Sequence, residues 1–448
     1  MVTITYILTC LTPVHIGTGV QYSKFDGAYQ DRHWQVMDLD KVLARGADAN
    51  ALARAMNSRT FSWSDWLGQQ QMTPRDGALY TLPCPQDPAD TPVREAMKTV
   101  YQQPYLPGTS VKGAIRTAVL SSLLNEQRAQ QTFVEEYLTL CLRARDVYAR
   151  IEADRAFDKV NVQRDILAQT LGMSAEQARS YQQTLYRILN IRQERLGETR
   201  TWRDFQRRLQ NLGRNREWLG QPVERAVLGP DPNHDLMRAV HVSDTAPIAL
   251  EQLAVGLVWT YILRGNRLVE KREQDGDYKA FVEWLTPETT LRLALRLDDF
   301  LFTEAANRDL RFRSAQTRAV QQLAYTCNVY ARTIITAEQE FYATHGLDSL
   351  RDVYAELAAT LSALPDGAFL LNVGWGGGWE VKTVGELLHK ALGADGFRQL
   401  RQRYRLGVAP RTGQLTQNAP FPKTRRIAYE GGAPRWPLGW VKMAPQEG

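Results

Sequence analysis

Residues 106–116 read Leu-Pro-Gly-Thr-Ser-Val-Lys-Gly-Ala-Ile-Arg, and this stretch is the most informative part of the 448-residue chain. Pro107 and Gly108 predict a turn, and Thr109 or Ser110 can then cap a helix. Apolar residues recur at helical spacing beyond this point. We therefore expect a tight turn that leads directly into a helix.

Two cations lie four residues apart on that helix, Lys112 and Arg116, beside an apolar face that includes Val111, Ile115 and Val119. Cations next to the exposed amides of a helix N-terminus suit a phosphate group. The same pattern also fits an ordinary capped helix whose two cations are solvated. The residues alone leave both interpretations open.

The segments on either side predict a mixture of strands and helices. Residues 114–171 contain no glycine or proline and keep a helical period, and a second helical stretch covers about 300–363. Strand-like runs occur at 2–10, 33–38, 238–243, 253–263, 368–373 and 439–443. Strands at both ends with helices between them favour an α+β architecture.

Changes in composition divide the chain into four segments. We predict the first part of a core at 1–117, a helical insertion at 118–236, a continuation of the core at 237–300, and a final unit at 301–448. The final unit combines a helical segment with a strand and a glycine-rich loop.

The composition is that of a globular protein of the reducing cytoplasm. Hydrophobic residues make up 44% of the chain, and its four cysteines are too scattered for a disulfide framework or a zinc site. We find no segment that reads as a membrane span, and the N-terminus alternates like a strand rather than a signal peptide. The net charge of +6 is modest, but 44 of the 55 basic residues are arginine, which suits phosphate contacts. A GC-rich genome would also raise the arginine content.

A glycine-rich segment, Gly374-Trp-Gly-Gly-Gly-Trp379, follows an apolar strand. Glycines permit positive φ and the close approach of another backbone, and successive amides can cradle an anion. Thr383 and Glu386 form a capping-box pattern for a following helix. The spacing matches no nucleotide-binding fingerprint, so no cofactor is expected. Trp375 and Trp379 could stack on bases or anchor the core, and a plain strand-to-helix turn is equally compatible.

A basic stretch without a single acidic residue lies near the C-terminus. Its members are Arg398, Arg401, Arg403, Arg405, Arg411, Lys423, Arg425 and Arg426. Because a solvated face usually mixes both signs of charge, this imbalance favours a surface that contacts phosphates.

Catalytic patterns are scarce. The six histidines show no metal-ligand spacing, so no metal site is predicted. His15 follows the first strand, where a structural histidine is the simpler interpretation than a general base. Asp26 and Asp31 lie in the same early region, without a recognisable catalytic context.

Taken together and in order, these segments resemble a known family. They are Leu11–Gly19 (Leu-Thr-Pro-Val-His-Ile-Gly-Thr-Gly), Pro104–Ala118, Arg238–Asp244, Asn372–Trp379, Phe421–Arg426 (Phe-Pro-Lys-Thr-Arg-Arg) and Pro437–Lys442. The chain resembles the RAMP superfamily of CRISPR effector proteins, and within it the subunit that caps type III-A Csm complexes. The Pro-Gly-Thr-Ser-x-Lys-Gly-x-x-Arg segment is the most specific of these matches.

The resemblance implies a ferredoxin-like (RRM-like) RAMP core with a large helical insertion and a second, related C-terminal unit. It implies a non-catalytic subunit that binds the 3′-side of the crRNA, supports crRNA 3′-end maturation and serves antiviral defence. The implied partners are crRNA, the repeated backbone subunit, the small helical subunit, a host exoribonuclease and, indirectly, target RNA. The implied RNA-binding residues are His15, Gly17, Lys112, Arg116, Gly374, Gly376, Gly377, Gly378, Lys382, Lys423, Arg425 and Arg426.

Two alternatives stay open at this point. One is a RAMP endoribonuclease that cleaves precursor crRNA or target RNA through Asp26 or His15, although neither Asp26 nor Asp31 lies in the Asp-x-x-Val context typical of target-cleaving relatives. The other is an unrelated adaptor whose basic surface binds acidic protein partners.

Overall fold

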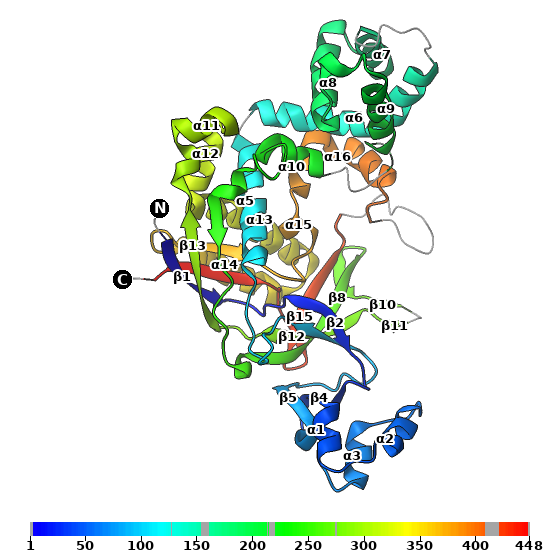
Figure 1. Ribbon diagram of the computed structural model, residues 1–448, viewed down its shortest axis with the longest axis vertical. Helices are drawn as coiled ribbons and strands as arrows, with labels where there is room; N and C mark the ends of the chain where they lie inside the picture. Colours follow the sequence, from blue (N-terminus) through cyan, green and yellow to red (C-terminus); the bar gives the residue numbers. More distant parts are fainter. Residues whose placement is uncertain are drawn as a thin grey trace.

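The computed structural model describes residues 3–446 apart from residues 127, 154–160, 213, 215–219, 274–275 and 408–420. Two β-sheets form the centre of the molecule (Figure 1). A helical lobe lies at one end of the long axis and a small lobe lies at the other (Figure 1). This arrangement confirms the predicted α+β class.

The first sheet joins strands from both ends of the chain. In spatial order its strands are β14 (Phe369–Asn372), β17 (Trp440–Pro445), β1 (Thr3–Cys10), β13 (Thr290–Leu297) and β7 (Val240–Val242). All neighbours are antiparallel, so β1 and β7 run parallel, and α5 (Gly108–Glu126) lies between them in sequence. The order β17-β1-β13-β7 is that of a ferredoxin-like sheet.

The second sheet contains the longest strand. Its members are β16 (Ala433–Trp436), β15 (Thr424–Glu430), β8 (Leu253–Arg264), β12 (Lys279–Leu285), β6 (Val93–Ala96) and β2 (Gly17–Tyr22), with β9 (Arg267–Glu270) paired to β8. A short ribbon of β10 (Arg272–Glu273) and β11 (Gly276–Asp277) extends this region. Strand β8 is apolar along nearly its whole length because side chains pack on both of its faces: Tyr261 in one cluster and Val258 in another.

Two long helices connect the sheets through one apolar cluster. These are α13 (Leu323–His345) and α14 (Asp348–Ser362), preceded by α11 (Glu304–Leu310) and α12 (Ser314–Gln321). Ile335 and Leu357 of the long helices pack with Leu370 of β14 and Ile427 of β15. Strands from the C-terminal segment therefore enter both sheets, and a shared core holds them.

Helices make up the described part of the segment that follows α5. It consists of α6 (Arg128–Ala153), α7 (Asn161–Leu171), α8 (Ala175–Leu189), α9 (Thr199–Leu212) and α10 (Gln221–Leu228). Helix α16 (Gly385–Arg403) packs against α6 (Figure 1), and the Tyr404 hydroxyl donates to the Leu212 carbonyl at 2.6 Å. These helices therefore pack against the C-terminal segment. The predicted boundary at 117/118 falls inside α5, which continues to Glu126.

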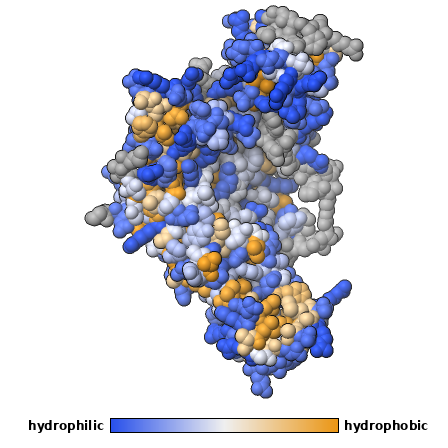
Figure 2. All heavy atoms as spheres, in the orientation of Figure 1, coloured by the Kyte–Doolittle hydropathy of each residue, from blue (hydrophilic) through white to orange (hydrophobic). Residues whose placement is uncertain are grey.

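A small lobe interrupts the first predicted segment. It contains β3 (Gly27–Gln30), β4 (His33–Met37), β5 (Ala78–Pro83), α1 (Leu39–Ala44), α2 (Ala49–Met56), α3 (Trp63–Gln69) and α4 (Pro74–Gly77). Val42, Trp63 and Leu67 form its own buried core. Figure 2 shows apolar residues on the visible face of this lobe, and Leu39 and Leu43 are exposed. This lobe lies within the predicted 1–117 segment, whose composition does not mark it as separate.

Both predicted helix caps are wrong. Helix α5 begins at Gly108, so Thr109 and Ser110 lie inside it, and the Gly108 amide instead donates to the Asp244 carboxylate at 2.7 Å. Thr383 does accept from the Gly385 amide, but no capping box forms with Glu386, which pairs with Lys390. Each helix start depends on contacts that a local pattern does not contain.

None of the helices in the described ranges is both long and apolar enough to cross a membrane.

Candidate nucleic-acid interface

A cleft of about 610 Å³ lies where three distant segments meet, and we call it the loop cleft. The segments are the β1–β2 loop with the start of β2, the face of α5 that carries Ser110, Gly113 and Thr117, and the glycine-rich loop with Lys382. Arg94 and Glu95 of β6 complete the lining. The cleft therefore unites the His15–Gly17 motif with the glycine-rich motif, which lie more than 350 residues apart.

The glycine-rich loop is docked on the β1–β2 loop through backbone groups. The Trp375 amide donates to the His15 carbonyl at 2.8 Å. Gly374 has φ +71°, and a Cβ there would lie 2.3 Å from the same carbonyl oxygen. Only glycine fits this approach, which confirms the prediction that the loop allows another backbone to come close.

Trp375 holds two guanidinium groups at the edge of the cleft. The Cζ atoms of Arg94 and Arg426 lie 5.0 and 4.5 Å from its ring centroid, and His15 meets it edge-on. Cation–π contacts of this kind contribute about 0.5–2 kcal/mol each. Burial and the neighbouring Arg94 lower the pKa of Arg426. The indole therefore positions two cations rather than offering a free stacking face.

Lys382 supplies a third cation. It ends the short helix α15 (Gly378–Lys382), and its ammonium donates to the Asn372 carbonyl at 3.0 Å. Much of the side-chain stem is exposed, but the ammonium group is enclosed by the loop, and this burial lowers its pKa to about 8. Lys382 is thus a cation at neutral pH that can lose its charge in mildly alkaline solution.

His15 is a buried member of the cleft wall. Its Nδ1 donates to the Glu283 carbonyl at 2.6 Å, and burial lowers its pKa to about 4. The Glu283 carboxylate is fully buried as well and accepts from Lys98, Tyr80 and the Ala96 amide. This network fixes a neutral imidazole in place, so the structure favours the structural interpretation of His15.

A smaller hollow of about 240 Å³ also borders the glycine-rich loop. Gly376, Gly377 and Gly378 line it together with Arg425 and Arg426. Arg425 is largely buried and forms an ion pair with Glu338 of α13 at 2.7 Å. The predicted grouping of the glycine-rich loop with the Arg425 region is therefore present, but the charge of Arg425 is already compensated.

Lys112 and Arg116 lie elsewhere. Neither lines the loop cleft, because Ser110, Gly113 and Thr117 occupy the side of α5 that faces it. Arg116 forms ion pairs with Asp235 at 2.7 Å and Glu224 at 3.2 Å. Lys112 and Arg116 therefore do not converge on the glycine-rich loop with the other residues implied to bind RNA. RNA contact by Lys112 and Arg116 stays a prediction.

Several residues of the C-terminal basic stretch have structural partners. Arg398 pairs with Asp395, Arg403 donates to the Leu142 carbonyl, and Arg401 is buried against Phe421. The backbone carbonyl of Lys423 accepts from the Leu263 amide. Arg411 lies outside the described residues. The absence of acidic residues from the stretch was therefore a weaker sign of a phosphate surface than it first suggested.

The candidate catalytic residues have structural contacts. The Asp26 carboxylate accepts from the amide and hydroxyl of Ser23 in a tight turn, and Asp31 has φ +52° in the β3–β4 turn. Within the described ranges, no group of three or more His, Cys, Asp or Glu side chains is placed to hold a metal ion.

Sequence reasoning missed Arg94, Ser110, Gly113 and Thr117 as cleft residues. A single arginine in a four-residue strand carries no local signal. The helix positions could have been found by extending the 3.6-residue period, since Ser110, Gly113 and Thr117 share one face. None of these three residues is charged, so the face carries no sign of a phosphate contact in the sequence.

Comparison with known proteins identifies the family. The RAMP superfamily profile matches residues 7–381, which is most of the chain. A curated relative, the "CRISPR system Cms protein Csm5" of Streptococcus thermophilus, is 26% identical over 132 residues, which cover 26% of this chain and 37% of that protein. The matched region thus spans little more than a third of this relative.

Two solved structures share the fold over nearly the whole chain. One is a chain of a Csm-crRNA-target RNA ternary complex of a type III-A CRISPR-Cas system, with a TM-score of 0.62, 22% identity and coverage of 99% of this chain and 100% of that chain. The other is Csm5 from T. onnurineus, with a TM-score of 0.55, 20% identity and coverage of 97% and 99%. Together with the profile match, these findings confirm the predicted resemblance: the chain belongs to the RAMP superfamily.

Proposed function

We propose that this protein is a crRNA-binding, non-catalytic subunit of a type III-A effector complex, placed at the 3′-side of the crRNA. The observation that carries the proposal is the loop cleft, where Arg94 and Lys382 line an open hollow beside Gly374, and where Trp375 of the wall holds Arg426 against its ring. Cations and backbone amides are the groups that bind a sugar–phosphate strand without reading its sequence. Family membership and the fold shared with a subunit of an RNA-containing complex support it.

The capping position, the support of crRNA 3′-end maturation and the recruitment of a host exoribonuclease are the finer parts of this proposal. They rest on the motifs shared with the capping subunit and on the similarity to Csm5 proteins. The exposed apolar residues of the small lobe, Leu39 and Leu43 among them, fit a contact with a neighbouring backbone or small helical subunit.

A binding experiment tests the RNA-binding role. The variant Lys382→Ala/Arg426→Ala is compared with wild type by fluorescence anisotropy with single-stranded RNA over a range of salt concentrations. Loss of two phosphate contacts lowers the log–log salt slope by about 1.4 and weakens binding at low salt.

The matched control is Arg75→Ala/Lys390→Ala, which removes one guanidinium and one ammonium from exposed positions outside the cleft. Equal weakening by the control, or wild-type affinity that is flat in salt, would argue for an adaptor that binds acidic proteins instead.

The maturation role is tested in the native host. Effector complexes assembled with and without this chain in the native host are compared by sequencing the crRNA 3′-ends. Longer or more heterogeneous 3′-ends are expected when the chain is absent, and identical ends would contradict the maturation role.

The endoribonuclease alternative receives a separate test. Burial lowers the pKa of His15 to about 4, which makes the lone pair left on its Nε2 a weak base, and Asp26 is engaged in its turn. We therefore expect Asp26→Asn, Asp31→Asn and His15→Gln to leave target-RNA cleavage by the assembled complex unchanged. Loss of cleavage in any of these variants would favour the enzyme.

A further inference from the structure

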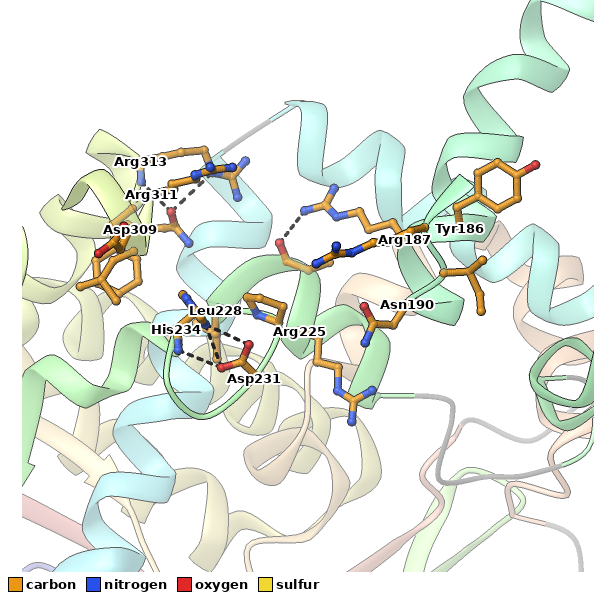
Figure 3. A pocket seen from close by; sticks show the side chains of 18 residues that line it. Tyr186, Arg187, Asn190, Arg225, Leu228, Asp231, His234, Asp309, Arg311 and Arg313 are labelled. Atoms are coloured by element: carbon orange, nitrogen blue, oxygen red, sulfur yellow. Dashed lines mark hydrogen bonds and ion pairs between the residues drawn. The ribbon is translucent and has the colours of Figure 1, made fainter. Parts of the chain in front are cut away.

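A second basic hollow has a volume of about 770 Å³. It shares no lining residue with the loop cleft. We call it the arginine cleft. It lies between α8 and α10 of the helical lobe and the segment that joins α11 to α12 (Figure 3). The side chains of Arg187, Arg192, Arg225, Arg311 and Arg313 line it, with Asp231 and Asp309 as the acidic members.

The charges of this cleft are unbalanced. Five guanidinium groups face two carboxylates, and one of these carboxylates, Asp231, is bonded to His234 at 2.9 Å. Burial and the nearby Arg313 lower the pKa of Arg187. Like charges held together from different elements repel each other unless an anion lies between them.

The walls of the cleft are held in a fixed arrangement. Arg187 of α8 donates to the Ala226 carbonyl of α10 at 2.5 Å, and Gln316 of α12 donates to the Val227 carbonyl at 2.7 Å. Figure 3 shows Arg311 and Arg313 entering from the α11–α12 side and Arg187 from the opposite side. These hydrogen bonds tie together the helices that carry the arginines around one space.

The lining indicates the kind of ligand. The cleft is open to solvent rather than enclosed, which suits a chain molecule better than a small ligand. Guanidinium groups bind phosphate oxygens in a bidentate manner. The two aromatic residues, Tyr186 and Phe312, are buried, so they offer no exposed ring on which a base could stack. Contacts to phosphates rather than to bases are expected.

We propose that the arginine cleft binds the phosphodiester backbone of single-stranded RNA, as a second contact separate from the loop cleft. The proposal rests on the proposed function for the identity of the ligand, and it adds a site that the sequence motifs of the family do not include. It makes the helical insertion an RNA-binding element rather than only a structural one.

The test uses the full-length protein and two lengths of RNA. The variant Arg192→Ala/Arg225→Ala/Arg311→Ala removes three cleft arginines, and the matched control Arg179→Ala/Arg203→Ala/Arg308→Ala removes three exposed arginines from the helical elements α8, α9 and α11 outside the cleft. An RNA of about six nucleotides fills one site, and one of about thirty can reach both.

We expect the cleft variant to bind the long RNA at least about tenfold more weakly, with a salt slope lower by about two, since each phosphate contact contributes about 0.7. Binding of the short RNA to the loop cleft stays at the wild-type level, as does all binding by the control. Thermal unfolding of both variants verifies that they are folded. A cleft variant that binds the long RNA like wild type, or a control that is equally weakened, overturns the proposal.

Photocrosslinking of long RNA that carries 4-thiouridine provides a second readout. Crosslinks to residues 187–192 and 309–316 are expected. If Lys382→Ala/Arg426→Ala binds the short RNA like wild type while these crosslinks persist, the loop-cleft function is wrong and the arginine cleft stands. Absence of these crosslinks, or their loss on competition by an acidic peptide but not by RNA, overturns the arginine cleft.

Discussion

At the scale of single residues, neighbours decide which cations are available to a ligand. Arg116 and Arg425 carry the same group as Arg426, but carboxylates of Asp235 and Glu338 already neutralise them. Arg426 lies on an indole ring, which attracts the cation without cancelling its charge. The position of an arginine in a motif is therefore a poor guide to its role unless its partner is known.

Lys382 makes RNA binding sensitive to mildly alkaline pH. Its pKa of about 8 leaves the ammonium charged at pH 7 and mostly neutral at pH 9, so RNA affinity should fall across this interval. In Lys382→Arg the side chain stays charged, and the fall should disappear. Anisotropy titrations at constant ionic strength measure the effect. A wild-type affinity that does not change with pH would exclude Lys382 from the interface.

His15 makes the folding stability depend on pH in mildly acidic solution. Because burial holds its pKa near 4 against an ordinary 6.5, the unfolded chain takes up a proton between these values while the folded chain does not. The contribution of neutral His15 to the free energy of unfolding should therefore be fully present above pH 6.5. The free energy of unfolding should then decline by about 3 kcal/mol as the pH falls toward 4.

Denaturant unfolding of His15→Gln and of the partly exposed control His33→Gln, at several pH values, measures this contribution. The slope of stability against pH between 6.5 and 4 should be smaller in His15→Gln than in wild type. Equal slopes in all three proteins would contradict the burial of a neutral His15.

At the scale of elements, helix α5 shows how a remote contact sets a boundary. Its first amide, at Gly108, is capped by Asp244, which follows β7 and lies 136 residues away. A Cβ on Gly108 would lie 2.4 Å from the carbonyl oxygens of Val242 and Ser243. The Pro-Gly-Thr-Ser segment and the His-Val-Ser-Asp segment are thus two halves of one junction between α5 and the first sheet.

Substitutions at this junction test whether the remote residue Asp244 or the local residue Thr109 caps helix α5. Asp244→Ala should destabilise the protein by about 1 kcal/mol, with Asp244→Asn closer to wild type because its amide oxygen can still accept. Gly108→Ala should destabilise it more, because backbone atoms must move. Thr109→Ala, at the locally predicted cap, should have little effect. Chemical denaturation measures the stability of all four variants. A larger loss of stability in Thr109→Ala than in Asp244→Ala would show that Thr109, not Asp244, caps the helix.

At the scale of the whole molecule, the C-terminal segment closes the structure. Strand β17 lies between β14 and β1 in the first sheet, while β15 pairs with β8 in the second. Arg425 of β15 and Glu338 of α13 form an ion pair inside this assembly, with side chains 12% and 6% exposed. A charge this deeply buried is tolerated only while its partner remains.

Removing Arg425 should therefore lower stability rather than RNA affinity. Arg425→Met should destabilise the protein by about 3 kcal/mol or more, because the Glu338 carboxylate is left uncompensated. The double variant Arg425→Met/Glu338→Gln should recover part of this loss. Unfolding and RNA titrations are measured on the same samples. Weak RNA binding by a fully stable Arg425→Met would instead assign this arginine to the interface.

The amino-acid sequence by itself determined the local features of this protein. Periodicity predicted the helices of the insertion and the strands that open and close the chain. The Gly374–Gly378 segment predicted a loop that allows another backbone to approach, since glycine's freedom is a property of the residue itself. The RAMP resemblance likewise followed from short motifs.

Only the tertiary structure decided which side chains meet. Arg94, Trp375 and Arg426 come from segments up to 332 residues apart, and their grouping depends on the registers β12–β6 and β15–β8. The tertiary structure also decided the small lobe, the Asp244 cap and the arginine cleft. Long-range pairing and burial select a few arginines from forty-four, and no local pattern contains that choice, because the partners are set by the packing of the whole chain.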